Sequence, residues 1–224
     1  LVQLQSITTY QDTDYVRRED FDGTPAPIAA LDRTGVDEAW SQELRVKYLG
    51  ERLSGAVGFY YFTNEEGFTD SFVIPATLVN AALPPSILIS RVATTNNATT
   101  NFAFFGDGEF ALSDRFDLLF GLRYDNEQVD NIAVATTGSV NPLPPGFGFL
   151  QALFGTQTNE IAADYEAWLP KAGLRWTVNR DVSFSFVAQR AYRAGGAEIS
   201  VLDGALNTFD PEFLWNYELA SRTV

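Results

Sequence analysis

Hydrophobic and polar residues alternate with a period of two along most of the chain, whereas the i, i+3, i+4, i+7 spacing of an amphipathic helix is almost absent. Such alternation is typical of strands that turn one face to an apolar environment and the other to a polar one. It predicts eight strands, at residues 1–11, 38–49, 53–64, 100–112, 115–128, 164–178, 181–192 and 212–222. The chain is therefore expected to be all-β.

The predicted connections fall into two classes that alternate strictly. Short turns of polar residues are expected at 50–52, 113–114 and 179–180, and long connections at 12–37, 65–99, 129–163 and 193–211. An antiparallel transmembrane β-barrel has this layout, with short periplasmic turns and long extracellular loops. The predicted strands also exceed the ~5–6 residues of an average soluble strand and suit the ~9–11 residues that a tilted strand needs to cross a bilayer.

The two faces of each predicted strand differ in chemistry. Leu44, Val46 and their neighbours share one face of 38–49, and charged residues share the other. Lipid on one side and a wet lumen on the other require this division. The lumen-facing candidates are Glu43, Arg45, Lys47, Asp107, Glu109, Arg123, Asp125, Lys171, Arg175, Glu218 and Arg222. They are expected either to form structural ladders of opposite charge or to contact a substrate.

Aromatic residues gather near the predicted strand ends, where an interfacial girdle would need rings with an apolar body and a polar edge. The candidates are Tyr48, Tyr61, Trp168, Trp176, Tyr192, Trp215 and Tyr217. Glycines interrupt several strands, at Gly55, Gly58, Gly106, Gly108, Gly121 and Gly173. Two interpretations stay open for them, relief of crowding on the lumen face and close approach of a ligand.

Composition excludes several classes of protein. Hydrophobic residues make up 46% of the chain, too many for a disordered segment, yet no apolar stretch approaches the ~18 residues of a membrane-spanning helix. The absence of Cys and His removes disulfides, zinc-thiolate sites and Ser-His-Asp catalysis. With 29 acidic residues against 15 basic ones, a nucleic-acid partner is not expected. We expect no enzyme activity and no cofactor, because no catalytic constellation assembles.

The long connections carry two further features. The stretch 12–38 holds eight acidic residues against three arginines, and Asp12, Asp14, Asp20 and Asp22 could supply oxygen ligands to Ca²⁺. Their spacing matches no defined calcium loop, so no metal site is assigned. The apolar, proline-rich stretches 84–89 and 142–150 are expected either to contact a substrate or partner, or to pack on neighbouring loops as a lid.

A family resemblance rests on several motifs in order. Gln42-Glu43-Leu44-Arg45-Val46, a short turn and Gly55-Ala56-Val57-Gly58-Phe59-Tyr60-Tyr61 form one hairpin. Phe104-Phe105-Gly106, Leu112-Ser113-Asp114 and Gly121-Leu122-Arg123-Tyr124-Asp125 form the next. Pro170-Lys171-Ala172-Gly173-Leu174-Arg175-Trp176, Tyr192-Arg193-Ala194-Gly195-Gly196, Phe209-Asp210-Pro211-Glu212 and Asn216-Tyr217-Glu218 follow. Over 38–222 this order resembles the barrel of TonB-dependent outer-membrane receptors of Gram-negative bacteria.

The resemblance implies a 22-stranded barrel with an N-terminal plug, which imports a scarce solute with energy transmitted by TonB. This chain would supply about eight strands of the wall as an internal part of the barrel domain (1–224), without the plug and without the N- and C-terminal strands. The implied partners are outer-membrane lipid, TonB through the missing plug, and a small-molecule substrate such as a ferric siderophore or a glycan. Two alternatives stay open: a passive channel or complete eight-stranded barrel, and a secreted carbohydrate-binding β-sandwich.

Overall fold

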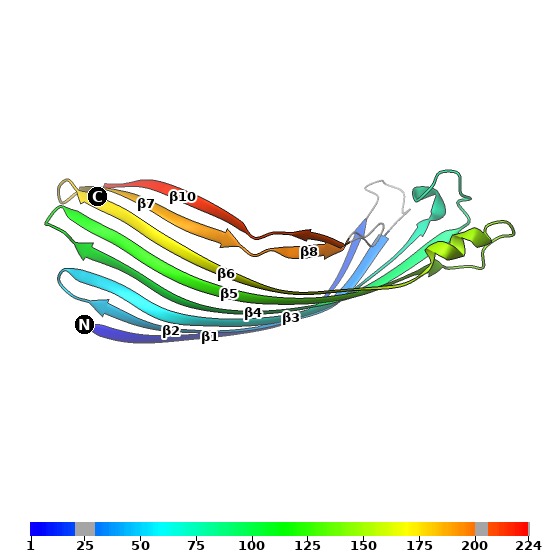
Figure 1. Cartoon of the computed structure of the whole chain (residues 1–224), viewed down its shortest axis with the longest axis horizontal. Helices are drawn as coiled ribbons and strands as arrows, with labels where there is room; N and C mark the ends of the chain where they lie inside the picture. Colours follow the sequence, from blue (N-terminus) through cyan, green and yellow to red (C-terminus); the bar gives the residue numbers. More distant parts are fainter. Residues whose placement is uncertain (21–29, 200–205, 224) are drawn as a thin grey trace.

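A computed structural model describes residues 1–20, 30–199 and 206–223. Its main feature is one antiparallel sheet in the order β1-β2-β3-β4-β5-β6-β7-β10 (Figure 1). The strands are β1 (Val2–Asp20), β2 (Ala30–Leu49), β3 (Leu53–Pro75), β4 (Leu88–Ala111), β5 (Phe116–Ser139), β6 (Gly155–Thr177), β7 (Val182–Arg193) and β10 (Glu212–Thr223). A separate pair joins β8 (Gly196–Ile199) to β9 (Leu206–Phe209), and short 3₁₀ turns η1 (Ala76–Leu78) and η2 (Gly148–Leu153) follow β3 and β5.

The sheet is a single open layer. Within the described ranges β1 pairs only with β2 and β10 pairs only with β7, and the other sheet is the two-stranded β8–β9 pair. Both described chain ends lie at the end that carries the short turns (Figure 1, left). We call that the proximal end and the opposite one the distal end. The open layer agrees with neither a β-sandwich nor an eight-stranded barrel closed on itself. No helix in the described part of the chain has the length and apolarity to cross a membrane.

The strands are longer than the sequence pattern predicts, and the predicted long connections are corrected accordingly. β3 runs to Pro75 and β4 starts at Leu88, so most of 65–99 is paired strand rather than loop. The same holds for 12–37 and 129–163, whose hairpin stems extend to Asp20–Ala30 and Thr137–Gly155. Threonine and other β-branched residues recur in the stems, and such residues favour strand pairing. One cross-strand pair is Thr69 on β3 and Thr94 on β4, whose Oγ1 atoms lie 3.0 Å apart.

The main hydrophobic core cluster lies at the distal end, not along the sheet. Its buried members are Leu31, Phe72, Ile74, Ala76, Ile87, Ile89 and Leu150, and Leu83, Leu143, Phe147 and Phe154 pack against them. These residues bring the tip of the β3–β4 hairpin against the tip of the β5–β6 hairpin (Figure 1, right). The stretches 84–89 and 142–150 therefore contribute Ile87, Ile89, Leu143, Phe147 and Leu150 to one cluster, so part of each stretch packs against the neighbouring hairpin tip.

Candidate functional site

The eleven charged candidates all lie on one face of the sheet, which we call the polar face. Strand register shows this directly, because Lys47 pairs with Ala56, Ala56 with Asp107, Asp107 with Gly121 and Gly121 with Lys171. The same register carries through Val187 on β7 to Glu218, and through Ser183 to Arg222. The predicted two-faced pattern is thus continuous across eight strands.

The opposite face, called the apolar face, is bounded by two rows of aromatic rings. The proximal row is Tyr48, Phe110, Phe116, Trp176 and Phe184, and the distal row is Tyr10, Trp40, Tyr61, Phe102, Tyr124 and Trp168. Several neighbours in a row are in contact range, with ring centroids 4.9 Å apart for Tyr124 and Trp168 and 6.4 Å apart for Phe116 and Trp176. Eight residues along a strand tilted by ~40° separate the rows by roughly 20 Å, close to the apolar band of an outer-membrane barrel.

Six of the seven predicted interfacial aromatics lie on the apolar face. Tyr48, Trp168 and Trp176 are among its exposed residues, and Tyr217 stacks on Phe186 with centroids 6.4 Å apart. Tyr192 is placed differently. The β6–β7 ladder ends at the pair Lys171 and Gln189, beside Pro170, which has no amide hydrogen to donate. Beyond that point Tyr192 lines a hollow together with Arg123 and Lys171, and its buried hydroxyl has no hydrogen-bond partner among the described residues.

Ion pairs cross the polar face between strands. The Lys171 ammonium lies 2.7 Å from Asp107 Oδ2, two strands away, and Arg175 contacts both Glu109 and Asp117. Arg175 Nε donates to Asp117 Oδ2 at 3.1 Å. These contacts form the ladder of opposite charge that the structural hypothesis expects.

Other candidates pair within their own strand. Arg45 pairs with Glu43, and Arg123 pairs with Asp125, which is buried and also accepts a hydrogen bond from Asn101. Within the ranges that the structure describes, Lys47, Glu218 and Arg222 form no ion pair. These three side chains remain available to groups outside the described chain.

Some glycines allow side chains to cross a strand. A Cβ atom on Gly121 would stand 2.8 Å from Asp107 Oδ2, and one on Gly58 would stand 2.4 Å from the Phe105 ring. These positions lie on the polar face, where the expected relief of crowding operates. Gly55, Gly106 and Gly108 lie on the apolar face instead, where a Cβ on Gly108 would meet the Phe120 ring at 2.7 Å.

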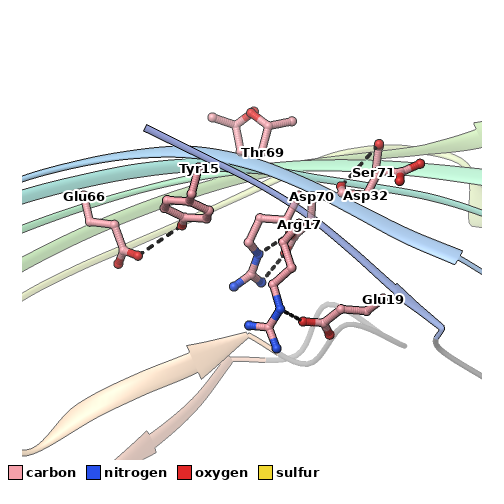
Figure 2. Close-up of polar contacts among 10 residues, drawn as sticks. Tyr15, Arg17, Glu19, Asp32, Glu66, Thr69, Asp70 and Ser71 are labelled. Atoms are coloured by element: carbon pink, nitrogen blue, oxygen red, sulfur yellow. Dashed lines mark hydrogen bonds and ion pairs between the residues drawn. The ribbon is translucent and has the colours of Figure 1, made fainter. Parts of the chain in front are cut away.

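A polar network occupies the hairpin stems distal to the aromatic row (Figure 2). The Tyr15 hydroxyl donates to Glu66 Oε1 at 3.3 Å, crossing Gly35 on β2, where a Cβ would stand 2.5 Å from the ring. Glu66 Oε2 accepts a hydrogen bond from Asn97 at 3.0 Å. Desolvation, together with the Glu66 carboxylate, raises the pKa of Tyr15 above its ordinary value of 10.0.

A bidentate ion pair stabilises the same stems. Arg33 donates from Nε and Nη2 to the two carboxylate oxygens of Asp70 at 2.6 and 2.7 Å, and its guanidinium carbon lies 4.3 Å from the Phe68 ring centroid. The hydrogen bonds to Asp70 raise the pKa of Arg33. This geometry joins β2 to β3 more firmly than a single exposed contact would.

The calcium candidates do not converge. Asp12, Asp14 and Asp20 belong to no group of three or more ligating side chains that could hold a metal among the described residues. Asp22 lies outside the described residues.

The stem residues were not predicted, because their segments were expected to be loops. Tyr15, Arg33, Glu66, Asp70 and Asn97 alternate in register with their neighbours, and this alternation is the signal that could have revealed them. Arg91, a buried residue at the distal end, was missed for the same reason.

The continuous apolar face, its aromatic rows and the charged face behind it define a wall segment of a transmembrane antiparallel β-barrel. The barrel-domain model described as "TonB dependent receptor-like, beta-barrel" matches residues 2–222. The chain belongs to this family, and it is an outer-membrane β-barrel segment rather than an enzyme.

Solved structures of low sequence identity share the fold. The ferric yersiniabactin uptake receptor FyuA from Yersinia pestis superposes with a TM-score of 0.74 at 18% identity, covering 100% of this chain and 31% of that one. The siderophore receptor PiuA from Acinetobacter baumannii gives 0.60 at 12%, covering 98% and 35%. The ferric-catecholate import receptor Fiu from E. coli K12 gives 0.54 at 15%, covering 99% and 41%. The chain thus spans about a third of the length of these receptors.

Proposed function

We propose that this chain forms part of the barrel wall of a receptor that imports a scarce solute, a ferric siderophore first of all, across the outer membrane. The observation that carries the proposal is the pairing of a membrane-type apolar face with an ion-paired polar face, which we assign to the barrel lumen. The siderophore is favoured because receptors with the same fold are named as a ferric yersiniabactin uptake receptor, a siderophore receptor and a ferric-catecholate import receptor.

Under this proposal, other parts of the parent protein complete the transporter. A plug domain and further strands of the parent protein would close the barrel against the free edges of β1 and β10 and fill its interior. Three inward groups form no ion pair within the described ranges and are suited to contact them: Lys47, Glu218 and Arg222. TonB would supply energy through the plug. The distal end would face the outside of the cell.

Energy-dependent uptake by the full-length parent protein tests this proposal. Cells that express it as their only siderophore receptor should accumulate ⁵⁵Fe supplied as a ferric siderophore, and deletion of tonB should abolish the accumulation. Uptake that persists without TonB and rises linearly with concentration would favour the passive channel instead. Absence of uptake for ferric siderophores, with growth on a glycan, would change the substrate class but keep the receptor.

A further inference from the structure

Arg91 on β4 is a charged residue almost completely withdrawn from solvent. Only 6% of its surface is exposed, and in register it lies between Phe72 on β3 and Thr137 on β5, on the polar face of the distal end. Within residues 1–20, 30–199 and 206–223 its side chain forms no ion pair, hydrogen bond or aromatic contact. Arg33 on β2, which lies on the same face and whose side chain is 30% exposed, has Asp70 as its carboxylate partner.

An unpaired guanidinium is an unfavourable group to bury. Arginine cannot escape the cost by losing its proton, because its pKa lies far above any physiological pH. A protein tolerates a buried charge where an ion of opposite charge pairs with it. The planar guanidinium group can donate two parallel hydrogen bonds to a carboxylate. The burial of Arg91 therefore indicates an anionic partner that is not among the described residues.

A cavity of about 530 Å³ beside Arg91 offers room for that partner. Phe72 and Ile74 from the β3–β4 hairpin and Leu150 and Phe154 from the β5–β6 hairpin form its apolar wall. Thr137 and Gln157 add polar groups that can donate or accept hydrogen bonds. At the rim Val79 and Leu153 are 58% and 64% exposed, so the cavity communicates with solvent.

We propose that Arg91 is the anion-recognition residue of a ligand pocket between the two hairpin tips, and that the ligand is an organic carboxylate with an apolar or aromatic body. The guanidinium binds the carboxylate, and the tip cluster covers the apolar part. A mainly apolar wall with a few convergent polar groups is the usual composition of a small-molecule site. The inference deepens the proposed uptake function, on which it rests for the biological meaning of the ligand.

Calorimetric titration of the purified full-length receptor in detergent tests the pocket. The probes are trans-cinnamate and its neutral isostere trans-cinnamamide, which differ only in the group that Arg91 would bind. We expect the wild type to bind cinnamate more tightly than cinnamamide. Arg91→Met should weaken cinnamate at least about tenfold and leave cinnamamide unchanged. Arg180→Met, the same substitution in a proximal turn, should change neither.

Thermal unfolding provides a second measurement, which shows whether the Arg91→Met variant is folded when its binding is lost. Arg91→Met removes a buried unpaired charge, so its apparent melting temperature without probe should be higher than that of the wild type. Cinnamate should raise the melting temperature of the wild type and leave that of Arg91→Met unchanged. Equal affinity of wild type and Arg91→Met for cinnamate, or a wild type without preference for the carboxylate, would overturn the pocket.

The two proposals can fail separately. Binding to purified receptor needs no TonB, so intact Arg91-dependent binding without energy-dependent uptake would overturn only the transport function. If TonB-dependent uptake is intact but wild type and Arg91→Met bind cinnamate with equal affinity, only the pocket is overturned.

Discussion

The ammonium of Lys171 on β6 lies 2.7 Å from the carboxylate of Asp107 on β4, across the intervening strand β5. The pair exists because Gly121 puts no side chain between them. A Cβ at residue 121 would stand 2.8 Å from Asp107 Oδ2 and 3.5 Å from Lys171 Cβ. One glycine thus lets a polar contact span two strand spacings.

Gly121→Val should separate the two charges and crowd the polar face. Overpacking of this kind costs about 1–3 kcal/mol of unfolding free energy, measured by urea unfolding of the full-length protein in detergent. Gly138→Val is the matched control, because a Cβ there meets nothing within 4 Å. Lys171→Gln should cost less than about 1 kcal/mol, since the pair is partly exposed. Equal effects of the two valine substitutions would refute the crossing role of Gly121.

Neighbouring residues on β5 test which face meets lipid. Phe120 lies midway between the aromatic rows on the apolar face, whereas Leu119 points to the polar face. Phe120→Arg should cost about 2–4 kcal/mol and reduce the folded, heat-modifiable band in outer-membrane preparations, because it places a cation near the bilayer midplane. Leu119→Arg should leave that band nearly unchanged. The reverse order would invert the assignment of the two faces.

Because of the raised pKa of Tyr15, we expect the folded protein to lose stability at alkaline pH. Its folded-state pKa is raised above the ordinary 10.0, so the folded state holds the phenol proton more tightly than the unfolded state. The resulting stabilisation is complete below pH about 10 and is lost as the pH rises through the folded-state pKa. Tyr15→Phe, which keeps the ring over Gly35, should lose less stability than the wild type between about pH 8 and about pH 11 in urea titrations. Identical pH profiles would contradict the assignment.

The Arg33 and Asp70 pair should hold the β2–β3 stem closed. Asp70→Ala leaves a half-buried guanidinium without its bidentate partner and should cost about 1–3 kcal/mol locally. Hydrogen exchange of the backbone amides of residues 30–35 should report the loss of protection. Asp32→Ala is the control, because Asp32 pairs with Arg18 at 3.5 Å with both side chains largely exposed. Similar exchange in the two variants would show that the bidentate geometry adds nothing.

The proximal half of the fold follows from the sequence, and the distal half does so only in part. Between the aromatic rows apolar and charged residues alternate strictly on β2, where Leu44, Val46 and Tyr48 alternate with Glu43, Arg45 and Lys47, because one face meets lipid and the other carries ion pairs. Distal to the row that contains Tyr124, the two faces differ less in polarity, so residues such as Thr94 and Asn97 carry little contrast although they stay paired. A strand whose two faces differ little in polarity has the same sequence pattern as a polar loop. The sequence pattern therefore predicts connections where the structure has hairpin stems.

The candidate site divides in the same way. Charged positions on a strongly alternating strand, such as Lys171 and Arg175, could be assigned to a face from the sequence alone. Their partners could not, because an ion pair across two strands depends on register and on a glycine at the crossing. The isolation of Arg91 depends on two hairpin tips folding together, which no local pattern encodes.

The length of the paired stems sets a distance scale for the whole molecule. From Tyr124 on the aromatic row to Thr137, the neighbour of Arg91, β5 continues as one unbroken strand. Thirteen residues at ~3.3 Å each and a tilt of ~40° correspond to a height of roughly 30 Å above the bilayer surface. A solute held at the tips would still be several molecular diameters from the pore mouth, so capture and entry would be separate steps with separate rate constants.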